Sequence, residues 1–364
     1  MYLLSVCIPT RNRPKELLKT VKAIEDQIEA ANALNEVEIV ISDNTDRDEL
    51  RLAPSDFPYV NLTFLSNDGN IGYARNVNKV FFSAKGTYTW LLADDDIPLD
   101  GAILHILNAL RDQNPSRPIN YLTYFTGAIL SGKAVDNFYS ITADIDYYMD
   151  GRDFLQPYWL SIIFISSNIF CREKMIEHAQ KYNLFENVND VFQNSLLSIS
   201  FIDKLGGVKI IPKTLLLDTY RPKNYTPYTS INVPVIQYVK LLKQLESISV
   251  SAECIELIRK SVNEHLLGYG LGFVIRKIET DDHFQYGDEY KKFVKDSYLQ
   301  IDTRGWALAF FMIFRVIQFN KTIGRFLVKL PFFLKRRLNV YNKIKEEMIE
   351  FNRMNKNSEI KISY

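Results

Sequence analysis

The stretch Thr87-Tyr88-Thr89-Trp90-Leu91-Leu92-Ala93-Asp94-Asp95-Asp96 is an apolar segment that ends in three consecutive aspartates. Its first six residues predict a β-strand that is buried on both faces. If the backbone stays extended through the triplet, the carboxylates of Asp94 and Asp96 point to the same side. Paired carboxylates suit Mg²⁺ or Mn²⁺, because these ions prefer oxygen ligands. A solvated acidic turn is the alternative, and the triplet alone does not decide between the two.

Three further strand patterns precede this one, and helical patterns alternate with them. The strands are predicted over 3–8, 37–41 and 60–65, and the helices begin near Pro14 and cover 73–84. This alternation predicts an α/β fold in which helices flank a mostly parallel sheet. Polar clusters follow the four strands, at 10–13, 42–44, 67–70 and 94–96. Because ligands of such sheets bind at the carboxyl ends of the strands, the clusters predict one shared site.

Composition and charge exclude several classes of protein. The chain has 364 residues, 47% of them hydrophobic, and a net charge of +1, so nothing in its charge indicates a nucleic-acid partner. Three cysteines without a CxxC pair argue against a disulfide scaffold and favour a reducing compartment. The sequence shows no signal-peptide pattern and no apolar run of roughly 18 residues, so we expect a cytoplasmic protein.

The pattern after residue 100 is less regular. It predicts helices over 101–113 and 186–202, and strands over 121–129, 160–170 and 208–220. Beyond residue 230 nearly every pattern is helical. We therefore expect an α/β domain over 1–230 and a mainly α-helical C-terminal region over 231–364.

Four motifs carry a resemblance to a known family. They are Val6-Cys7-Ile8-Pro9-Thr10-Arg11-Asn12-Arg13, Ile41-Ser42-Asp43-Asn44, Asn70-Ile71-Gly72-Tyr73-Ala74-Arg75-Asn76 and Trp90-Leu91-Leu92-Ala93-Asp94-Asp95-Asp96. In this order and spacing they resemble the family 2 glycosyltransferases, which have the GT-A fold. The resemblance is strong over residues 3–100, fades toward residue 220 and does not reach the C-terminal third. It implies inverting, metal-dependent transfer of a sugar from a nucleoside diphosphate donor, for which the family favours UDP.

The resemblance also implies a nucleotide-sugar site. Asp43 would accept a hydrogen bond from the base or the ribose, although a simple strand-end turn is an alternative for this residue. Arg75 would lie near the donor, unless it is a solvated helix residue. The full set implied outside the triplet is Pro9, Thr10, Arg11, Asp43, Asn70 and Arg75.

Within the triplet, the resemblance implies a division of roles. Asp96 would bind the Mn²⁺ or Mg²⁺ ion with Asp94 as its partner, and Asp94 would also lie near the ribose or sugar. Asp95 would belong to the donor site but point the other way. Many family members carry an acidic residue where this chain has Ala93, which blurs the division of roles among the three aspartates.

Inverting transfer needs a base within hydrogen-bond reach of the acceptor hydroxyl. Family members usually carry an acidic residue near the start of a later helix, where this chain has Glu186 and Asp190. On a helix these two would share a face, and we favour Asp190, then Glu186, with Asp153 third. The alternative is that both are acids favoured by a helix dipole. Arg221, with Lys223, is expected either to fold over the diphosphate as a lid or to lie in a plain surface loop.

The C-terminal third has a charge pattern of its own. Ten Lys or Arg and no Asp or Glu occur over 303–345, where they flank Phe-rich segments. This pattern suits an interfacial membrane anchor, or else an amphipathic bundle that packs on the first domain or forms a homo-oligomer. An anchor would fit a lipid-linked acceptor.

We therefore predict a glycosyltransferase that acts on a bacterial surface glycan: capsule, O-antigen, lipopolysaccharide or a polyprenyl-linked oligosaccharide. One alternative is a sugar nucleotidyltransferase, but such enzymes cradle a triphosphate in a Gly-rich loop, and residues 9–13 contain no glycine. The other is a non-catalytic module that binds sugar nucleotides or glycans. The intact acidic triplet argues against that module.

Overall fold

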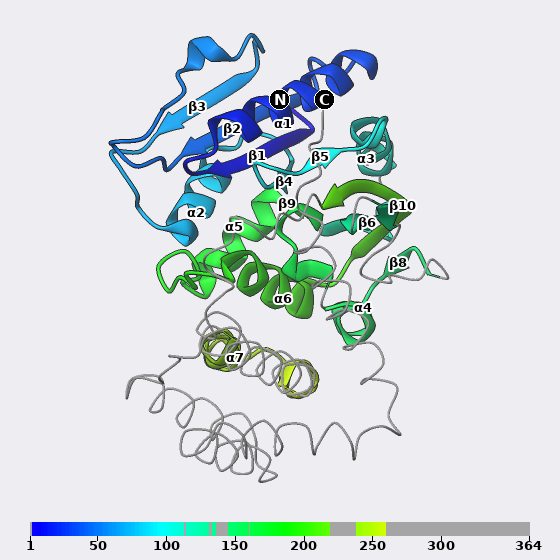
Figure 1. Cartoon of the computed structure of the whole chain (residues 1–364). Coiled ribbons are helices and arrows are strands. Elements are labelled where there is room, and N and C mark those ends of the chain that lie inside the picture. Colours follow the sequence, from blue (N-terminus) through cyan, green and yellow to red (C-terminus); the bar gives the residue numbers. More distant parts are fainter. Residues whose placement is uncertain are drawn as a thin grey trace, which may run out of the picture. The chain divides into compact units, whose positions relative to one another are not determined.

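A computed structural model of the chain describes residues 2–112, 114–130, 133–135, 145–159, 161–218 and 238–259. Its contacts divide the chain into two units, Met1–Asn224 with Lys240–Leu257, and Tyr225–Val239 with Ile258–Tyr364. The features below belong to the first unit (Figure 1). Predictions were made for Arg221, Lys223 and residues 303–345, and all of these lie outside the described residues. Among the described helices, none is both long and apolar enough to cross a membrane.

The first hundred residues form the expected parallel half of the sheet. The elements are β1 (Leu4–Thr10), α1 (Pro14–Ala30), β2 (Val37–Asp43), β3 (Leu62–Ser66), α2 (Tyr73–Ser83) and β4 (Tyr88–Leu91). The strands lie side by side in the order β3-β2-β1-β4, and every neighbouring pair is parallel. The prediction of a mostly parallel sheet flanked by helices is therefore confirmed.

Burial explains why these segments take their places. All seven residues of β2 are buried, because helices cover both faces of the sheet here. Helix α1 begins with Pro14, whose missing N–H is not needed in the first turn. Its apolar face, which includes Val21 and Ile24, packs in the main core with Val6 and Trp90. Helix α2 contacts β1 and β2, and α3 (Ala102–Arg111) packs against α1 (Figure 1).

The second half of the sheet is mixed. The strands β9 (Asn168–Cys171), β6 (Tyr121–Leu130), β10 (Val208–Asp218) and β5 (Ile97–Pro98) continue the order after β4. Strand β9 runs antiparallel to both of its neighbours, whereas β6 and β10 are parallel. The remaining elements are β7 (Lys133–Val135), β8 (Tyr147–Tyr148), α4 (Gly151–Tyr158), α5 (Arg172–Lys181), α6 (Gln193–Leu205) and α7 (Tyr238–Ser247), with short 3₁₀ turns at Pro54–Asp56, Ser161–Ile163 and Ile165–Ser167.

Two element predictions were wrong for the same reason. Where a strand was predicted over 160–170, residues 161–171 form two 3₁₀ turns and then a four-residue strand, because the Ser167 and Asn168 side chains donate to nearby carbonyls. The helix expected over 186–202 begins only at Gln193, because the Asn189 Oδ1 accepts hydrogen bonds from the amides of Val191 and Phe192. Glu186 and Asp190 therefore lie before α6 and do not share a helix face.

Candidate active site

The carboxyl ends of β1, β2, β3 and β4, with the residues that follow them, form what we call the strand edge. Thr10 pairs with Asp43, and Asp43 with Ser66, so three of these ends lie level with one another. Buried Asn76 ties them together from helix α2. Its side-chain nitrogen, Nδ2, donates to the main-chain carbonyls of Thr10 (3.2 Å) and Ser42 (3.1 Å). The convergence of polar clusters predicted from the sequence is therefore present in the fold.

A second layer of asparagines fixes the loop between β3 and α2. The side-chain nitrogen of Asn67 donates to the Asn76 side-chain oxygen at 3.0 Å. Asn70 accepts hydrogen bonds from the Asn44 side chain (2.8 Å) and from the Gly72 amide (2.9 Å). Asn70 therefore holds its own loop. Asn76, which the sequence motif contains but to which no role was assigned, is the residue that joins the strands.

The acidic triplet does not continue the strand. Strand β4 ends at Leu91, and Asp94 and Asp95 lie in a turn in which the Asp96 amide donates to the Ala93 carbonyl at 3.4 Å. The assumption of extended backbone through the triplet was therefore wrong. The turn forms because the side chains are held by partners on other elements, and these partners give the three aspartates different surroundings.

Arg13 bridges the first two aspartates of the triplet. Its Nη1 lies 3.0 Å from Asp94 Oδ1 and 2.8 Å from Asp95 Oδ2. Asp94 and Asp95 thus share one cation, and Asp95 does not point away from its neighbour as expected. Sequence reasoning missed this role, although Arg13 stands in the first motif and directly precedes α1.

Asp94 is buried and fully engaged. Its Oδ2 accepts a hydrogen bond from the Thr10 hydroxyl at 2.6 Å, and its main-chain oxygen accepts one from Thr20 at 3.0 Å. Burial raises the pKa of Asp94 to about 6, and the charge of Arg13 opposes this rise. Thr10 therefore positions the triplet directly, and its place in the nucleotide site stays a prediction.

Asp96 is held from the opposite side. Its Oδ2 accepts a hydrogen bond from the Ser166 hydroxyl at 2.5 Å, and the side chain is buried. The same Ser166 oxygen accepts from the Ala93 amide at 2.9 Å, and the Ser166 carbonyl accepts from Trp90 Nε1 at 2.7 Å. The irregular segment before β9, which was predicted as a strand, therefore supplies the support for Asp96.

Asp43 has one carboxylate oxygen in use and one without a partner. Oδ1 accepts a hydrogen bond from the Thr45 amide at 2.9 Å. Oδ2 is buried and makes no hydrogen bond to any residue that the structure describes. A buried carboxylate oxygen without a donor is costly, so this atom is the clearest sign of a ligand group at the strand edge.

The remaining predicted donor-site residues surround this edge. Arg11 pairs with Asp46 at 2.8 Å, and both side chains are well exposed. Arg75 is exposed on α2 and forms no ion pair within the described part of the chain. Pro9 is half-buried near the end of β1.

The two candidates for the catalytic base, Glu186 and Asp190, lie between α5 and α6. We call this segment the 183–192 loop. Both Glu186 and Asp190 are exposed, and Asp190 pairs with Lys240 of α7 at 3.3 Å. Neighbouring amides fix the loop from several elements. Gln244 of α7 accepts from the Asn189 side chain at 2.8 Å and donates to the Asn187 carbonyl at 2.9 Å.

The loop also connects to α2. Gln193, the first residue of α6, donates to Asn78 at 3.0 Å, and it accepts a hydrogen bond from the Asn189 amide at 2.8 Å. The Tyr73 hydroxyl donates to Asn194 at 3.2 Å. The fold therefore places the start of α6 beside α2, the helix that carries Asn76.

Comparison with known proteins identifies this architecture. Residues 5–124 match the family model described as glycosyl transferase family 2. Over these residues the chain is similar to the family 2 glycosyltransferases. The matched residues contain all four motifs and the entire strand edge. A search of curated proteins gives no match to the sequence.

Solved structures extend the likeness to most of the chain. S. aureus TarS 1–349 in complex with UDP-GlcNAc matches with a TM-score of 0.58 and 12% identity, covering 84% of this chain and 82% of that one. A longer S. aureus TarS structure matches with a TM-score of 0.53 and 13% identity, covering 84% of this chain and 50% of that one. At these identities the likeness establishes the fold, and the predicted GT-A fold is confirmed.

The mannosyltransferase PcManGT from Pyrobaculum calidifontis, in complex with GDP-Man and Mn²⁺, also matches. Its TM-score is 0.49 at 12% identity, covering 88% of this chain and 87% of that one. At this score it adds nothing to the fold assignment.

The carboxylates at the strand edge fit a divalent cation only in part. Asp94 and Asp96 offer the oxygen ligands that Mg²⁺ and Mn²⁺ prefer. Both oxygens of Asp94, however, already accept hydrogen bonds from Thr10 and Arg13. Within the described residues there is no group of three or more His, Cys, Asp or Glu that could hold an ion. These residues therefore fit an ion that takes most of its ligands from a bound diphosphate.

Proposed function

We propose that this glycosyltransferase moves a sugar from a nucleoside diphosphate donor to a hydroxyl of a glycan, with inversion at the sugar carbon. UDP is the favoured nucleotide, and the acceptor is a bacterial surface glycan. The observation that carries the proposal is the partnerless, buried Oδ2 of Asp43 at the strand edge. A ribose hydroxyl or a base N–H would satisfy this oxygen.

The surroundings of Asp43 support a nucleotide rather than a free sugar. Asp43 lies level with Thr10, whose hydroxyl donates to Asp94, so the two carboxylates are joined through the ends of β1 and β2. A nucleoside bound at Asp43 would extend its diphosphate toward the triplet. TarS, which shares this fold, is known in complex with UDP-GlcNAc, and that agrees with a donor of this class.

We assign the protein groups as follows. Asp96, with Asp94 beside it, would hold a Mn²⁺ or Mg²⁺ ion. When bound, the ion would stabilise negative charge on the departing diphosphate. Arg13 keeps the carboxylates of Asp94 and Asp95 together by its two contacts.

Asp190 is the proposed base. The acceptor oxygen attacks the sugar carbon, the bond from that carbon to the phosphate oxygen breaks, and the acceptor proton passes to the Asp190 carboxylate. Asp190 is exposed and therefore open to an acceptor that arrives from solvent. Lys240 and the hydrogen bonds of Asn189 limit its freedom to move.

Donor binding provides the first test. Calorimetric titrations with UDP-, GDP-, dTDP- and CDP-sugars, with and without Mn²⁺, should show tight binding of one nucleotide class. Asp43→Asn keeps the side-chain size but replaces an acceptor by a donor, so it should weaken that binding at least tenfold, because a buried mismatched group results. Asp96→Ala should remove the dependence on Mn²⁺.

Asp26→Asn, which alters an exposed ion pair with Lys22 on α1, is the matched control and should bind like wild type. Equal affinity for every sugar nucleotide in wild type and Asp43→Asn would disprove the proposal. The cytoplasmic location and the membrane-surface role of 303–345 stay predictions.

A further inference from the structure

A cavity of about 810 Å³ lies between β8 and α4, far from the strand edge. Strand β8 pairs with the beginning of β10 through Tyr148 and Val208. Strand β5, which directly follows the acidic triplet, pairs with the other end of β10 at Leu216. The neighbouring strand β6 covers the same stretch in five residue steps, from Tyr121 to Thr126, so the two points lie roughly 17 Å apart along the sheet.

The floor of the cavity is rigid. The ring of Tyr148 meets Phe154 edge-on at 5.7 Å and Tyr158 at 6.3 Å, and this fixes its orientation. Gly151 at the start of α4 approaches α6 so closely that a Cβ there would lie 1.8 Å from the Ile202 carbonyl. Helix α4 is therefore held closely against α6.

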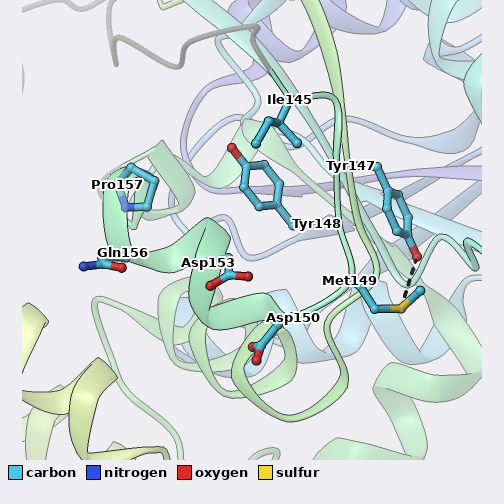
Figure 2. Close-up of a pocket in the computed structure, with 8 residues that line it drawn as sticks. All are labelled: Ile145, Tyr147, Tyr148, Met149, Asp150, Asp153, Gln156 and Pro157. Carbon is cyan, nitrogen blue, oxygen red and sulfur yellow. Dashed lines mark hydrogen bonds between the residues drawn. The ribbon is translucent and has the colours of Figure 1, made fainter.

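The lining combines apolar surface with unengaged hydrogen-bonding groups, and Figure 2 shows these side chains around the ring of Tyr148. Ile145 and Met149, which are 51% and 59% exposed, contribute apolar surface to the lining. Asp153 and Gln156 are exposed on successive turns of α4. Neither makes a hydrogen bond or ion pair with any residue that the structure describes.

Charge narrows the choice of ligand. Two carboxylates, Asp150 and Asp153, line the cavity, and Asp150 is paired with Arg152 at 2.5 Å. The remaining negative charge, that of Asp153, disfavours a phosphate, a nucleotide or an acidic glycan. Groups that donate hydrogen bonds and carry an apolar face are favoured instead, and neutral sugars have both properties. A pyranose ring presents C–H groups that pack on an aromatic face, and its hydroxyls donate to carboxylate and amide oxygens.

We propose that this cavity is a second glycan-binding site, which holds neutral sugar residues of the acceptor at a distance from the reaction. The inference rests on the proposed function in one respect, namely that the acceptor is a glycan. Tyr148 and Met149 form the packing surface, and Asp153 and Gln156 accept from sugar hydroxyls. A polymer that engages this site and the strand edge together gains affinity, because its second contact is intramolecular.

Direct binding tests the proposal. The full chain is titrated by calorimetry with cellotetraose, maltotetraose, mannotetraose and chitotetraose, in the presence of saturating UDP. At least one tetrasaccharide should bind, and the double variant Asp153→Ala with Gln156→Ala should weaken that binding fivefold or more. Both side chains are exposed, so the double variant should fold normally.

The matched control is Glu177→Ala with Gln180→Ala, an exposed acid and amide with the same spacing on α5. It should bind the tetrasaccharide like wild type. If no tetrasaccharide binds wild type, or if the two double variants bind equally well, the cavity is not a glycan site. Titrating the same proteins with sugar nucleotides separates the two proposals. If a tetrasaccharide binds but no sugar nucleotide does, only the proposed function is disproved.

Discussion

The strand edge and the 183–192 loop are held in place in different ways. At the strand edge, Asp43, Asp94 and Asp96 are buried. Thr10 and Arg13, which hold Asp94, come from the first hundred residues, and Ser166 holds Asp96. In the loop, Glu186 and Asp190 are exposed, and the amides that fix the backbone come from α6 and α7. One region is a cluster of buried carboxylates, and the other is a surface segment held by residues distant in the sequence.

The difference suggests a division of labour. Buried groups that are held by several hydrogen bonds, such as Asp94, keep their geometry whether or not a ligand is present, which suits the binding of a nucleotide. An exposed loop can accept acceptors of different shape, but its position depends on packing elsewhere in the chain. Changes in the loop should therefore affect turnover, and changes at the strand edge should affect donor binding and stability.

Asp190→Asn should give the largest effect. If Asp190 is the base, kcat should fall by roughly 10² to 10⁴, because general-base catalysis contributes about that much. Donor affinity, measured by calorimetry, should not change. Glu186→Gln is the control, since it removes a carboxylate from the same loop and should change kcat less. If donor affinity fell as much as kcat, the proposal that the loop affects turnover and the strand edge affects donor binding would be wrong.

Gln244→Ala tests whether the loop depends on α7. The substitution removes the hydrogen bonds to Asn187 and Asn189 and leaves buried polar groups unpaired, so the free energy of unfolding should fall by roughly 1 to 3 kcal/mol. We expect kcat to fall as well, at unchanged donor affinity. Urea unfolding and steady-state kinetics give both values. Gln180→Ala, at an exposed position on α5, should alter neither.

Arg13→Gln tests the strand edge. It removes the cation shared by Asp94 and Asp95 and should lower the free energy of unfolding by roughly 1 to 2 kcal/mol, a modest value because Arg13 is about one-third exposed. Donor binding should weaken together with stability. Arg13→Lys should restore stability only in part, because an ammonium group bridges two carboxylates less well. Arg11→Gln provides the comparison, since its partner Asp46 is exposed, and an equal loss there would contradict a special role for Arg13.

The lowered pKa of His178 should make stability depend on pH below neutrality, and this contribution should vanish at neutral pH. It is buried between α5 and α6, where burial first and then the charges of Lys181 and Lys204 lower its pKa to about 4. The unfolded chain binds a proton near pH 6.5, so between these values stability falls as pH falls, by about 2 kcal/mol from pH 7 to pH 5. Urea unfolding of wild type and His178→Gln across this range should show a steeper loss in wild type. Parallel profiles would mean that folding does not lower the pKa of His178.

Much of the donor half could be predicted from the sequence, because its signals are local. Strands β1 to β4 have apolar runs that end in polar clusters, and parallel pairing brings these ends to one edge. The family resemblance falls in the same residues and is confirmed over 5–124. Asp43, Asp94 and Asp96 are all buried at this edge, as a ligand site requires.

The later elements were predicted less well, because side chains there compete with the backbone. Asn189 caps the turn before α6, and Ser167 and Asn168 break the expected strand before β9. The pattern of apolar residues along the sequence gives no indication of such hydrogen bonds. Helices α4 and α5 were missed for a different reason: α4 is short, and only three residues of α5 are buried.

By itself, the sequence determined the α/β order, the family and the set of acidic residues at the strand edge, because each depends on neighbours in the chain. Only the tertiary structure decided how those acids are used. It placed Arg13 between Asp94 and Asp95, set Ser166 beneath Asp96 and left one oxygen of Asp43 without a donor. These contacts join residues as far as 70 to 82 positions apart. Spacing along the chain carries no information about such pairs, because folding alone brings them together.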